Sequence, residues 1–313
     1  MSKSNMLKLS FEEFMKESST EIPDIKPIDL TKGRGYYKDN SVEIIPGLQT
    51  GTFAILAGKS GVSKTKLAIH FALIASGLNQ DIGIEVNQDL NNEVVVVTCE
   101  DTQDQINEQT QTIKENLNID DAEWCKINSN LNLFSLKGYD VDIMNDKWEE
   151  KFIDMFTGKK LVILDNATNI HTMGEDNESF KLLGRRILKI ATKCNAAIVL
   201  VHHTSQLTKE NQSIDPIYRV RGGMSLVALA RVTYFMTDYL DDKKLFNSNG
   251  GIDGQVAYFA AQANNGNVPK DPIFLNKINA SNNNEGYSLE YKKGAIQNNN
   301  KQGSRDEKFK TIE

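Results

Sequence analysis

The period of hydrophobic and polar positions changes several times along the chain, and each change predicts an element. Four short apolar runs lack polar alternation, and two of them are rich in β-branched residues, a pattern typical of strands buried on both faces of a parallel sheet. These runs cover residues 52–57, 93–98, 160–165 and 196–201. The sequence therefore predicts a mostly parallel sheet.

Helical spacing of apolar residues fills two of the segments between these runs. Residues 65–76 place Leu67 and Phe71 on one face and end before Gly77, and residues 178–193 do the same with Phe180 and Leu183. Strands that alternate with helices predict an α/β fold, with helices flanking the central sheet. Further runs at 232–236, 255–261, 272–278 and 287–291 predict a β-rich C-terminal part.

The same patterns divide the chain into a core and two extensions. Residues 36–291 carry the alternation, whereas residues 1–35 form an arm in which Phe11, Phe14 and Met15 predict a short amphipathic helix at 9–16. Such a helix cannot bury its own apolar face, so we expect it to dock on its own chain or on a neighbouring subunit. Residues 292–313 are polar and predict a disordered tail.

Composition narrows the class of protein. With 39% hydrophobic and 25% charged residues the chain is an ordinary globular protein, and its net charge of −6 argues against general coating of polyanions. Its three cysteines contain no CxxC pair, which argues against a disulfide framework and a zinc ribbon. No apolar run approaches the length of a membrane span. We expect a cytoplasmic protein without membrane contact.

The segment that follows the first run is the strongest candidate for chemistry. It reads Gly58, Lys59, Ser60, Gly61, Val62, Ser63, Lys64 and Thr65. A loop between a buried strand and a helix is the context of phosphate-binding loops, whose backbone N–H groups converge on phosphate oxygens. We expect these residues to bind ATP, with Lys64 on the β- and γ-phosphates and the Thr65 hydroxyl at a Mg²⁺ position.

One residue departs from the usual GxxxxGK[ST] pattern, because Ser63 stands where the second glycine belongs. A side chain there crowds a tight turn and strains the backbone. The alternative is a Gly/Ser-rich turn at a helix start with an accidental lysine. The preceding strand and the following amphipathic helix favour nucleotide binding.

Acidic residues end two of the other predicted strands. Asp165 closes the run at 160–165, where a carboxylate could hold the water shell of Mg²⁺ or merely cap the next turn. Glu100 follows the run at 93–98 and could orient and deprotonate the attacking water. Asp101 is the competing candidate for this role, and we favour Glu100.

Two adjacent histidines end a third strand. His202 and His203 follow the run at 196–201 and precede Thr204. At the predicted active edge we expect a sensor of the γ-phosphate, although a histidine that merely satisfies local hydrogen bonds is the alternative. A metal site is disfavoured because no third ligand lies at suitable spacing.

Together these motifs resemble the RecA-like ATPases, and within them the plasmid RepA-type hexameric replicative helicases, relatives of the DnaB ring helicases. The resemblance covers about residues 40–270 and rests on the order of the motifs. They are the GxxxxSKT loop, Thr98-Cys99-Glu100-Asp101, residues 161–165, Val201-His202-His203-Thr204, and Arg221-Gly222-Gly223 followed by Arg231.

The resemblance implies a role for each matching residue. Lys64 and Thr65 match the phosphate-loop pair, Glu100 the catalytic glutamate and Asp165 the Mg²⁺-associated aspartate. His203 matches the sensor histidine. Arg231 matches the arginine finger that enters the site of the adjacent subunit, and the arm would pack on that neighbour.

A second departure concerns positive charge near the γ-phosphate. Gln262 stands where these helicases tend to carry a lysine on the last core strand, so a second cation supplied by the neighbour is expected to be missing. Its loss would slow turnover more than it weakens binding. Lys59 inside the loop is a conjectural substitute.

Two polar segments are candidates for contact with nucleic acid. The segment at 204–221 contains Lys209, Tyr218, Arg219 and Arg221, which offer three cations and one stacking ring, and a second segment covers 169–177. In RecA-like rings such loops face the central channel and grip the strand. The alternative is a surface loop with incidental charge.

These inferences predict an ATP- and Mg²⁺-dependent DNA helicase that forms a homo-oligomeric ring, expected to be a hexamer, on single-stranded DNA in replication. Loading or replication proteins are expected partners. Two alternatives remain: a mediator of recombination that coats single strands, and a degenerate ATPase that holds nucleotide as an assembly switch.

Overall fold

The computed structural model describes most of the chain between residues 41 and 291. It covers residues 31, 41–88, 93–174, 176–205, 215–221, 224–263, 268, 271–279 and 287–291. Two compact units divide the chain, Met1–Asn40 and Ser41–Glu313, and almost all described residues belong to the second. The predicted arm helix, Lys209 and the predicted tail lie outside the described residues.

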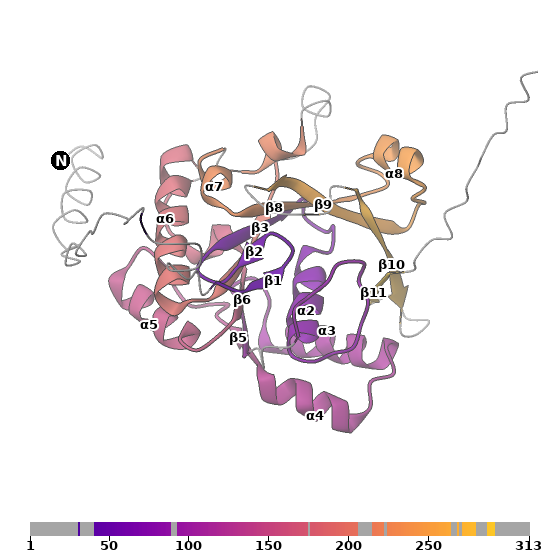
Figure 1. Ribbon diagram of the computed structural model, residues 1–313, viewed down its shortest axis with the longest axis horizontal. Coiled ribbons are helices and arrows are strands. Elements are labelled where there is room, and N and C mark those ends of the chain that lie inside the picture. The colour runs from indigo at the N-terminus through magenta and orange to yellow at the C-terminus, as the bar shows by residue number, and fades with distance from the viewer. Residues whose placement is uncertain are drawn as a thin grey trace, which may run out of the picture. The chain divides into compact units, whose positions relative to one another are not determined.

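In the described part of the chain, nine strands form one sheet in the order β11-β10-β9-β8-β3-β7-β6-β4-β5 (Figure 1). They are β3 (Phe53–Gly58), β4 (Val94–Thr98), β5 (Leu131–Ser135), β6 (Leu161–Asp165), β7 (Ala197–His203), β8 (Val232–Asp238), β9 (Gln255–Ala263), β10 (Ile273–Asn279) and β11 (Tyr287–Tyr291). The six strands from β8 to β5 run parallel. The other three continue the sheet as an antiparallel meander.

Helices cover both faces of this sheet, as Figure 1 shows. They are α2 (Lys64–Ala75), α3 (Gln103–Asn116), α4 (Asp121–Asn130), α5 (Asp146–Phe156), α6 (Asn177–Cys194), α7 (Met224–Leu229) and α8 (Lys243–Asn249), with 3₁₀ turns η1 (Ala167–Ile170) and η2 (Pro216–Arg219). A hairpin of β1 (Glu43–Ile45) and β2 (Leu48–Gln49) precedes β3.

The two faces of the sheet bury two separate hydrophobic clusters. Along β3, Leu56 packs into the cluster with α2, whereas its neighbour Ile55 packs into the cluster with α5 and α6. Leu161 and Val162 of β6 divide in the same way. Because successive side chains of a strand point to opposite faces, central strands covered on both sides need apolar residues at every position.

The predicted α/β fold, with its mostly parallel sheet and β-rich C-terminal part, is confirmed. Each predicted strand and both predicted core helices occur, with ends shifted by at most two residues. Sequence analysis made no prediction for 103–156, where α3, α4, β5 and α5 lie. The polar segments at 169–177 and 204–221, expected to be without periodic structure, contain part of η1 and all of η2.

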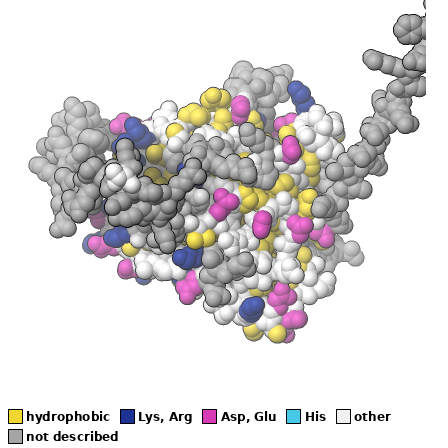
Figure 2. Space-filling view, in the orientation of Figure 1, with side chains coloured by type: hydrophobic (Ala, Val, Ile, Leu, Met, Phe, Trp, Pro, Cys, Tyr) yellow, Lys and Arg dark blue, Asp and Glu magenta, His cyan; other side chains and the backbone are white. Residues whose placement is uncertain are grey.

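Membrane crossing finds no support in this architecture. Among the described residues, no helix combines the length and the apolar character that a bilayer span requires. On the face of the molecule in Figure 2, basic side chains are scattered among acidic ones. The basic residues therefore form no broad patch on the described part of that face.

Candidate functional site

The parallel register brings the ends of four strands to one edge of the sheet. Gly58 at the end of β3 pairs with His203 at the end of β7, and Thr98 at the end of β4 pairs with Asp165 at the end of β6. Glu100 follows β4 by two residues. Ligands of open parallel sheets bind at this carboxyl edge. The predicted site residues of these strands thus converge.

The loop at 58–65 connects β3 to α2 as predicted. Gly58 is required by close packing, because a Cβ atom there would lie 2.7 Å from the carbonyl oxygen of Met236. Gly61 has a φ of 79°, in the left-handed region. The first turn of α2 holds no acidic residue, so the positive end of its dipole faces the loop without a competing carboxylate. The loop is therefore suited to an anion.

Ser63 also adopts the left-handed conformation, with φ 75° and ψ 24°. This conformation costs a non-glycine residue about 1–2 kcal/mol. The expected strain at this position is therefore present, and the loop nevertheless keeps the turn that a glycine would make easily.

The Lys64 side chain lies inside the site, with only 5% of the residue exposed. Its Nζ donates a 2.7 Å hydrogen bond to the Lys59 carbonyl oxygen and lies 3.3 Å from Nδ1 of His203. Burial lowers the pKa of Lys64 to about 8, against the opposing effect of Asp165 and Glu100. A phosphate oxygen would restore the charge stabilisation that burial removes.

Thr65 and Asp165 form the oxygen-rich corner of the site. The Thr65 hydroxyl donates a 2.6 Å hydrogen bond to Oδ2 of Asp165, and the other oxygen, Oδ1, is buried with no hydrogen-bond partner in the described part of the chain. Burial raises the pKa of Asp165 to about 6. A buried carboxylate oxygen without a partner beside a hydroxyl fits Mg²⁺, which prefers oxygen ligands and retains water.

The described residues contain no cluster of three His, Cys, Asp or Glu side chains that would hold a metal by themselves. This agrees with a Mg²⁺ held by Thr65 and Asp165 together with water and phosphate oxygens, which is how such sites usually hold the ion. A metal ion on His202 and His203 finds no support.

Asn166 is a site residue that sequence analysis missed. Its Nδ2 donates to Oε2 of Glu100 at 2.5 Å and lies 3.1 Å from Nε2 of His203. Asp101, the competitor of Glu100, instead accepts a hydrogen bond from Gln109 on α3. The signal available in the sequence was a polar residue directly after Asp165 at a strand end, which was insufficient to assign a role.

The two adjacent histidines have different surroundings. His203 faces Lys64 and Asn166, and its pKa is lowered by burial and then by the Lys64 charge. His202 is fully buried, its Nε2 lies 2.8 Å from the Arg221 carbonyl oxygen, and burial lowers its pKa to about 4. His203 alone of the pair faces the phosphate loop.

The conjecture that Lys59 replaces a missing cation near the γ-phosphate is wrong. Its Nζ lies 2.9 Å from carboxylate oxygens of both Asp238 and Asp241, at the end of β8. These two carboxylates neutralise the lysine and direct it away from Lys64. Lys59 therefore contributes its backbone to the loop, and its side chain anchors the loop to β8.

Arg231 and Gln262 lie at the opposite edge of the sheet. The Arg231 backbone N–H donates to the Phe53 carbonyl oxygen at the start of β3, and Gln262 pairs with Thr233 near the start of β8. Neither residue can reach the phosphate loop of its own chain. A role in the site of a neighbouring subunit stays a prediction for Arg231.

The candidate nucleic-acid residues differ in exposure. Tyr218 is 63% exposed, whereas Arg219 is 9% exposed and its guanidinium lies 5.0 Å from the centre of the Phe235 ring. Arg219 is therefore not the exposed cation that was expected, and burial lowers its pKa. The Arg221 backbone N–H donates to the His203 carbonyl oxygen, and its charge helps to lower the pKa of Lys64.

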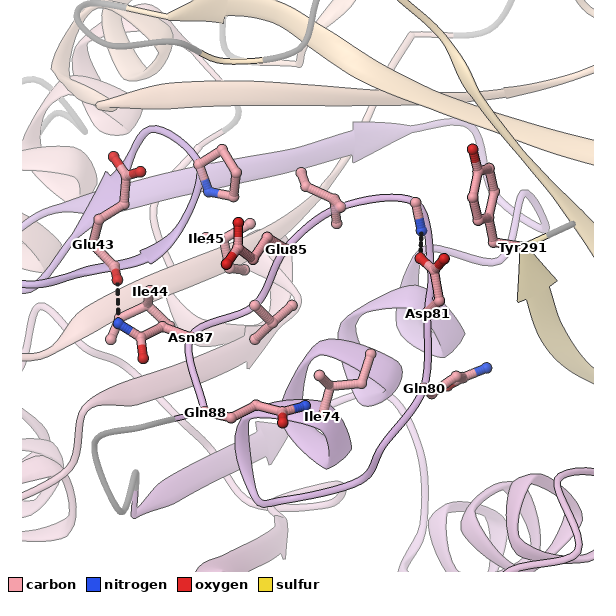
Figure 3. A pocket seen from close by; sticks show the side chains of 14 residues that line it. Glu43, Ile44, Ile45, Ile74, Gln80, Asp81, Glu85, Asn87, Gln88 and Tyr291 are labelled. Atoms are coloured by element: carbon pink, nitrogen blue, oxygen red, sulfur yellow. Dashed lines mark hydrogen bonds between the residues drawn. The ribbon is translucent and has the colours of Figure 1, made fainter. Parts of the chain in front are cut away.

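A cavity of about 930 Å³ lies elsewhere, near the C-terminal end of α2 (Figure 3). Its lining includes Glu43, Asp81 and Glu85 together with Ile74 and Tyr291. Two hydrogen bonds within this lining, from Gly83 N–H to Asp81 and from Asn87 to the Glu43 carbonyl, are drawn in Figure 3. Three carboxylates would repel a polyphosphate, so this cavity is no nucleotide site.

The sheet order, the loop at 58–65 and the residues at the carboxyl edge define a RecA-like P-loop ATPase fold, and the predicted resemblance is confirmed. The chain belongs to the AAA domain family, whose model (AAA_25) matches residues 38–209, more than half of the chain. No curated protein matches the chain significantly. The fold implies nucleotide binding.

Two solved structures share this fold. The ATPase domain of a helicase has a TM-score of 0.51 and 16% identity, over 72% of this chain and 81% of that chain. The KaiC-like protein PH0186 from Pyrococcus horikoshii OT3 has a TM-score of 0.51 and 12% identity, over 77% of this chain and 90% of that chain. Identities this low support the fold alone.

Proposed function

We propose that this protein hydrolyses ATP with Mg²⁺ and couples the reaction to movement along single-stranded DNA, as a homo-oligomeric ring helicase. The observation that carries the proposal is the convergence of Lys64, Thr65, Glu100, Asp165 and His203 around one loop. Each of these groups has a distinct use in phosphoanhydride hydrolysis.

In the proposed reaction the phosphate loop and Lys64 bind the polyphosphate and offset its charge. Thr65 and Asp165 would hold Mg²⁺, which when bound neutralises charge on the phosphate oxygens. Glu100 lies at the end of β4 and would accept a proton from the attacking water, and His203 would donate a hydrogen bond to the terminal phosphate. Partial burial of the site strengthens all of these interactions.

Assembly into a ring is proposed because the described chain brings no arginine of its own to the position of a finger. Arg231 lies at the opposite edge of the sheet from Lys64, so it could act only on another copy. A site shared between subunits couples hydrolysis in one copy to movement in the next. The likeness to the solved helicase ATPase domain supports this proposal at the level of the fold.

Contact with DNA is proposed for the segment around η2. Tyr218 offers an exposed ring on which a base can stack, and Arg221 lies next to His203 in the β-bridge between Thr204 and Val220. Lys209 belongs to the same proposal. A ring would repeat this segment in every subunit, which lets an acidic chain bind a strand through many weak contacts.

The decisive experiment measures ATP hydrolysis with and without single-stranded DNA, and the native mass with and without ATP. We expect DNA to stimulate hydrolysis, and we expect Lys64→Ala and Glu100→Gln each to lower it by at least about a hundredfold. Lys151→Ala and Glu150→Gln, both exposed on α5, are matched controls that should leave it unchanged. Hydrolysis that is indifferent to both site variants would refute the proposal.

Two other outcomes would favour the alternatives. Open filaments on single-stranded DNA, seen by electron microscopy, would indicate a mediator that coats DNA. Tight ATP binding with turnover at background would indicate a nucleotide-dependent assembly switch, an interpretation that the strained Ser63 and the cation-poor edge at Gln262 also allow.

A further inference from the structure

Asn166 lies at the centre of the hydrogen bonds that join the proposed catalytic groups. Its side chain is 2% exposed, and each of its polar atoms has a partner. Oδ1 accepts a 3.2 Å hydrogen bond from the backbone N–H of Asn169, and Nδ2 lies 2.5 Å from Oε2 of Glu100. An ionised carboxylate only accepts, so the atom that faces Glu100 must be the amide nitrogen. These two partners fix the orientation of the amide.

This orientation determines what His203 can do. The second hydrogen of Asn166 Nδ2 points to Nε2 of His203, 3.1 Å away. Because an amide nitrogen donates and does not accept, Nε2 must be the acceptor in this pair. A neutral imidazole carries one hydrogen, which must then lie on Nδ1. Burial and the Lys64 charge both lower the pKa of His203, which keeps the ring neutral.

The hydrogen on Nδ1 faces a second donor. Nδ1 of His203 lies 3.3 Å from Nζ of Lys64, and that ammonium group also donates to the Lys59 carbonyl oxygen. Two donors that face one another gain nothing from the contact, whereas a single anionic oxygen could accept from both. The pair is therefore arranged to receive an oxygen atom such as a terminal phosphate provides.

We propose that Asn166 is a positioning residue, which holds His203 in the tautomer with hydrogen on Nδ1 and holds the Glu100 carboxylate beside it. It would thereby align the phosphate sensor and the base for the same terminal phosphate. The inference rests on the proposed ATP hydrolysis for its use, but the tautomer of His203 is a property of the protein without nucleotide.

The test of the tautomer is ¹⁵N NMR of protein labelled at its four histidines, recorded without nucleotide at about pH 8, where a neutral imidazole is expected. His203→Gln assigns the signal by its loss. In the wild-type protein we expect the hydrogen on Nδ1. In Asn166→Asp, which keeps the shape but turns the donor into an acceptor, we expect it on Nε2 or on both nitrogens. Asn132→Asp, the same change at an exposed position of β5, should leave the wild-type signal.

The same Nδ1 signal in the wild type and in Asn166→Asp would overturn the inference, and so would a wild-type hydrogen on Nε2. This readout needs no hydrolysis, so it fails independently of the proposed function. If Asn166→Asp does not fold, Asn166→Ala serves in its place, because it removes the donor and should leave a mixture of both tautomers.

The kinetic test separates positioning from a merely structural role. In Asn166→Ala we expect kcat for ATP to fall by at least about tenfold while KM changes by less than about threefold, because the variant still binds phosphate through the loop and Lys64. An unchanged kcat, or a rise in KM alone, would overturn the positioning role. Absence of hydrolysis in the wild type would instead refute the proposed function.

Discussion

The hydroxyl of Thr65 donates a 2.6 Å hydrogen bond to Asp165, a residue 100 positions further along the chain. The parallel pairing of β3, β7 and β6 creates this contact, because all three strands end at the same edge. It leaves one Asp165 oxygen buried without a hydrogen-bond partner in the described residues. The site is therefore built for a ligand at a cost to the stability of the free protein.

That cost gives the first prediction. Burial raises the pKa of Asp165 from 3.8 to about 6, so above that pH the folded protein holds a buried charge that the unfolded chain exposes freely. Asp165→Asn should stabilise the metal-free protein at about pH 8 by roughly 1–3 kcal/mol, measured by denaturant unfolding. The gain should vanish below about pH 4, where the native carboxyl is protonated in both states.

The same variant should bind Mg²⁺-ATP less well, because an amide replaces a metal-binding carboxylate. Thermal unfolding with ATP, with and without EDTA, measures this loss: wild-type protein should show a metal-dependent rise in Tm that Asp165→Asn lacks. A variant that is both less stable and equally dependent on metal would contradict the argument. Asp154→Asn, a change on α5 away from the site, serves as the control.

A second prediction concerns His70, which is fully buried on α2 and joins the C-terminal strand β11 to this helix. Its Nε2 accepts a 3.1 Å hydrogen bond from the Leu289 N–H, and its Nδ1 lies 2.6 Å from Oε1 of Gln80. Burial lowers its pKa from 6.5 to about 4. Between these pH values the unfolded chain binds a proton that the folded protein does not, so the folded state loses stability as the pH falls.

Asp165 acts in the opposite direction over part of this interval, and His202 acts in the same direction, so the diagnostic quantity is a difference. His70→Gln should be less stable than wild type at about pH 7.5, and this deficit should shrink by roughly 1–3 kcal/mol towards about pH 4.5. Denaturant unfolding at several pH values measures it. A deficit that is constant with pH would contradict the burial of a neutral His70.

The central strands could be predicted from the sequence because nearly every residue on them is apolar. Val94 and Val162 lie on strands covered on both faces, and such runs are typical of a buried parallel sheet. The strand β5 was missed because it lies at the edge of the sheet, where Asn132 and Phe134 are exposed and the run is broken. Helix α3 was missed because its long polar face obscures the few buried positions, among them Ile106 and Ile113.

In the site, residues placed by strand ends could be predicted, and residues placed by side-chain direction could not. Glu100 and Asp165 follow from the position at which a parallel strand stops. Whether Arg219 faces solvent or packs on Phe235 depends on packing between elements far apart in sequence. For the same reason the partners of Lys59 on β8 were not foreseeable from the loop motif.

The third prediction separates the two lysines of the phosphate loop. Lys64→Met should lower ATP hydrolysis by at least about a hundredfold, because it removes the buried charge beside the phosphate site. Lys59→Met should keep most of the activity and lower stability by less than about 1 kcal/mol, since its ion pairs with Asp238 and Asp241 are partly exposed. Steady-state kinetics and unfolding measure both. Equal losses would restore the conjecture that Lys59 acts on the phosphate.

The fourth prediction separates two neighbours in the proposed DNA-binding segment. Tyr218→Ala should weaken binding of single-stranded DNA about five- to a hundredfold without changing Tm, because its exposed ring packs little on the fold. Arg219→Ala should lower stability by about 1–2 kcal/mol, because its guanidinium and alkyl chain are buried against Phe235. Fluorescence anisotropy and thermal unfolding measure the two effects. Tyr139→Ala, at a ring that is 68% exposed, controls for loss of any surface tyrosine.

The last prediction concerns Ser63, whose left-handed backbone stores strain that a glycine would not. The serine hydroxyl makes no capping hydrogen bond to α2, so Ser63→Gly removes no cap. Relief of the strain exceeds the extra flexibility that glycine gives the unfolded chain, and we expect Ser63→Gly to raise stability by up to about 1 kcal/mol. Ser63→Val should lower it by more than that, because a β-branched side chain tolerates positive φ poorly. Denaturant unfolding without nucleotide measures both, and equal stability of the two variants would show that the loop relaxes around residue 63.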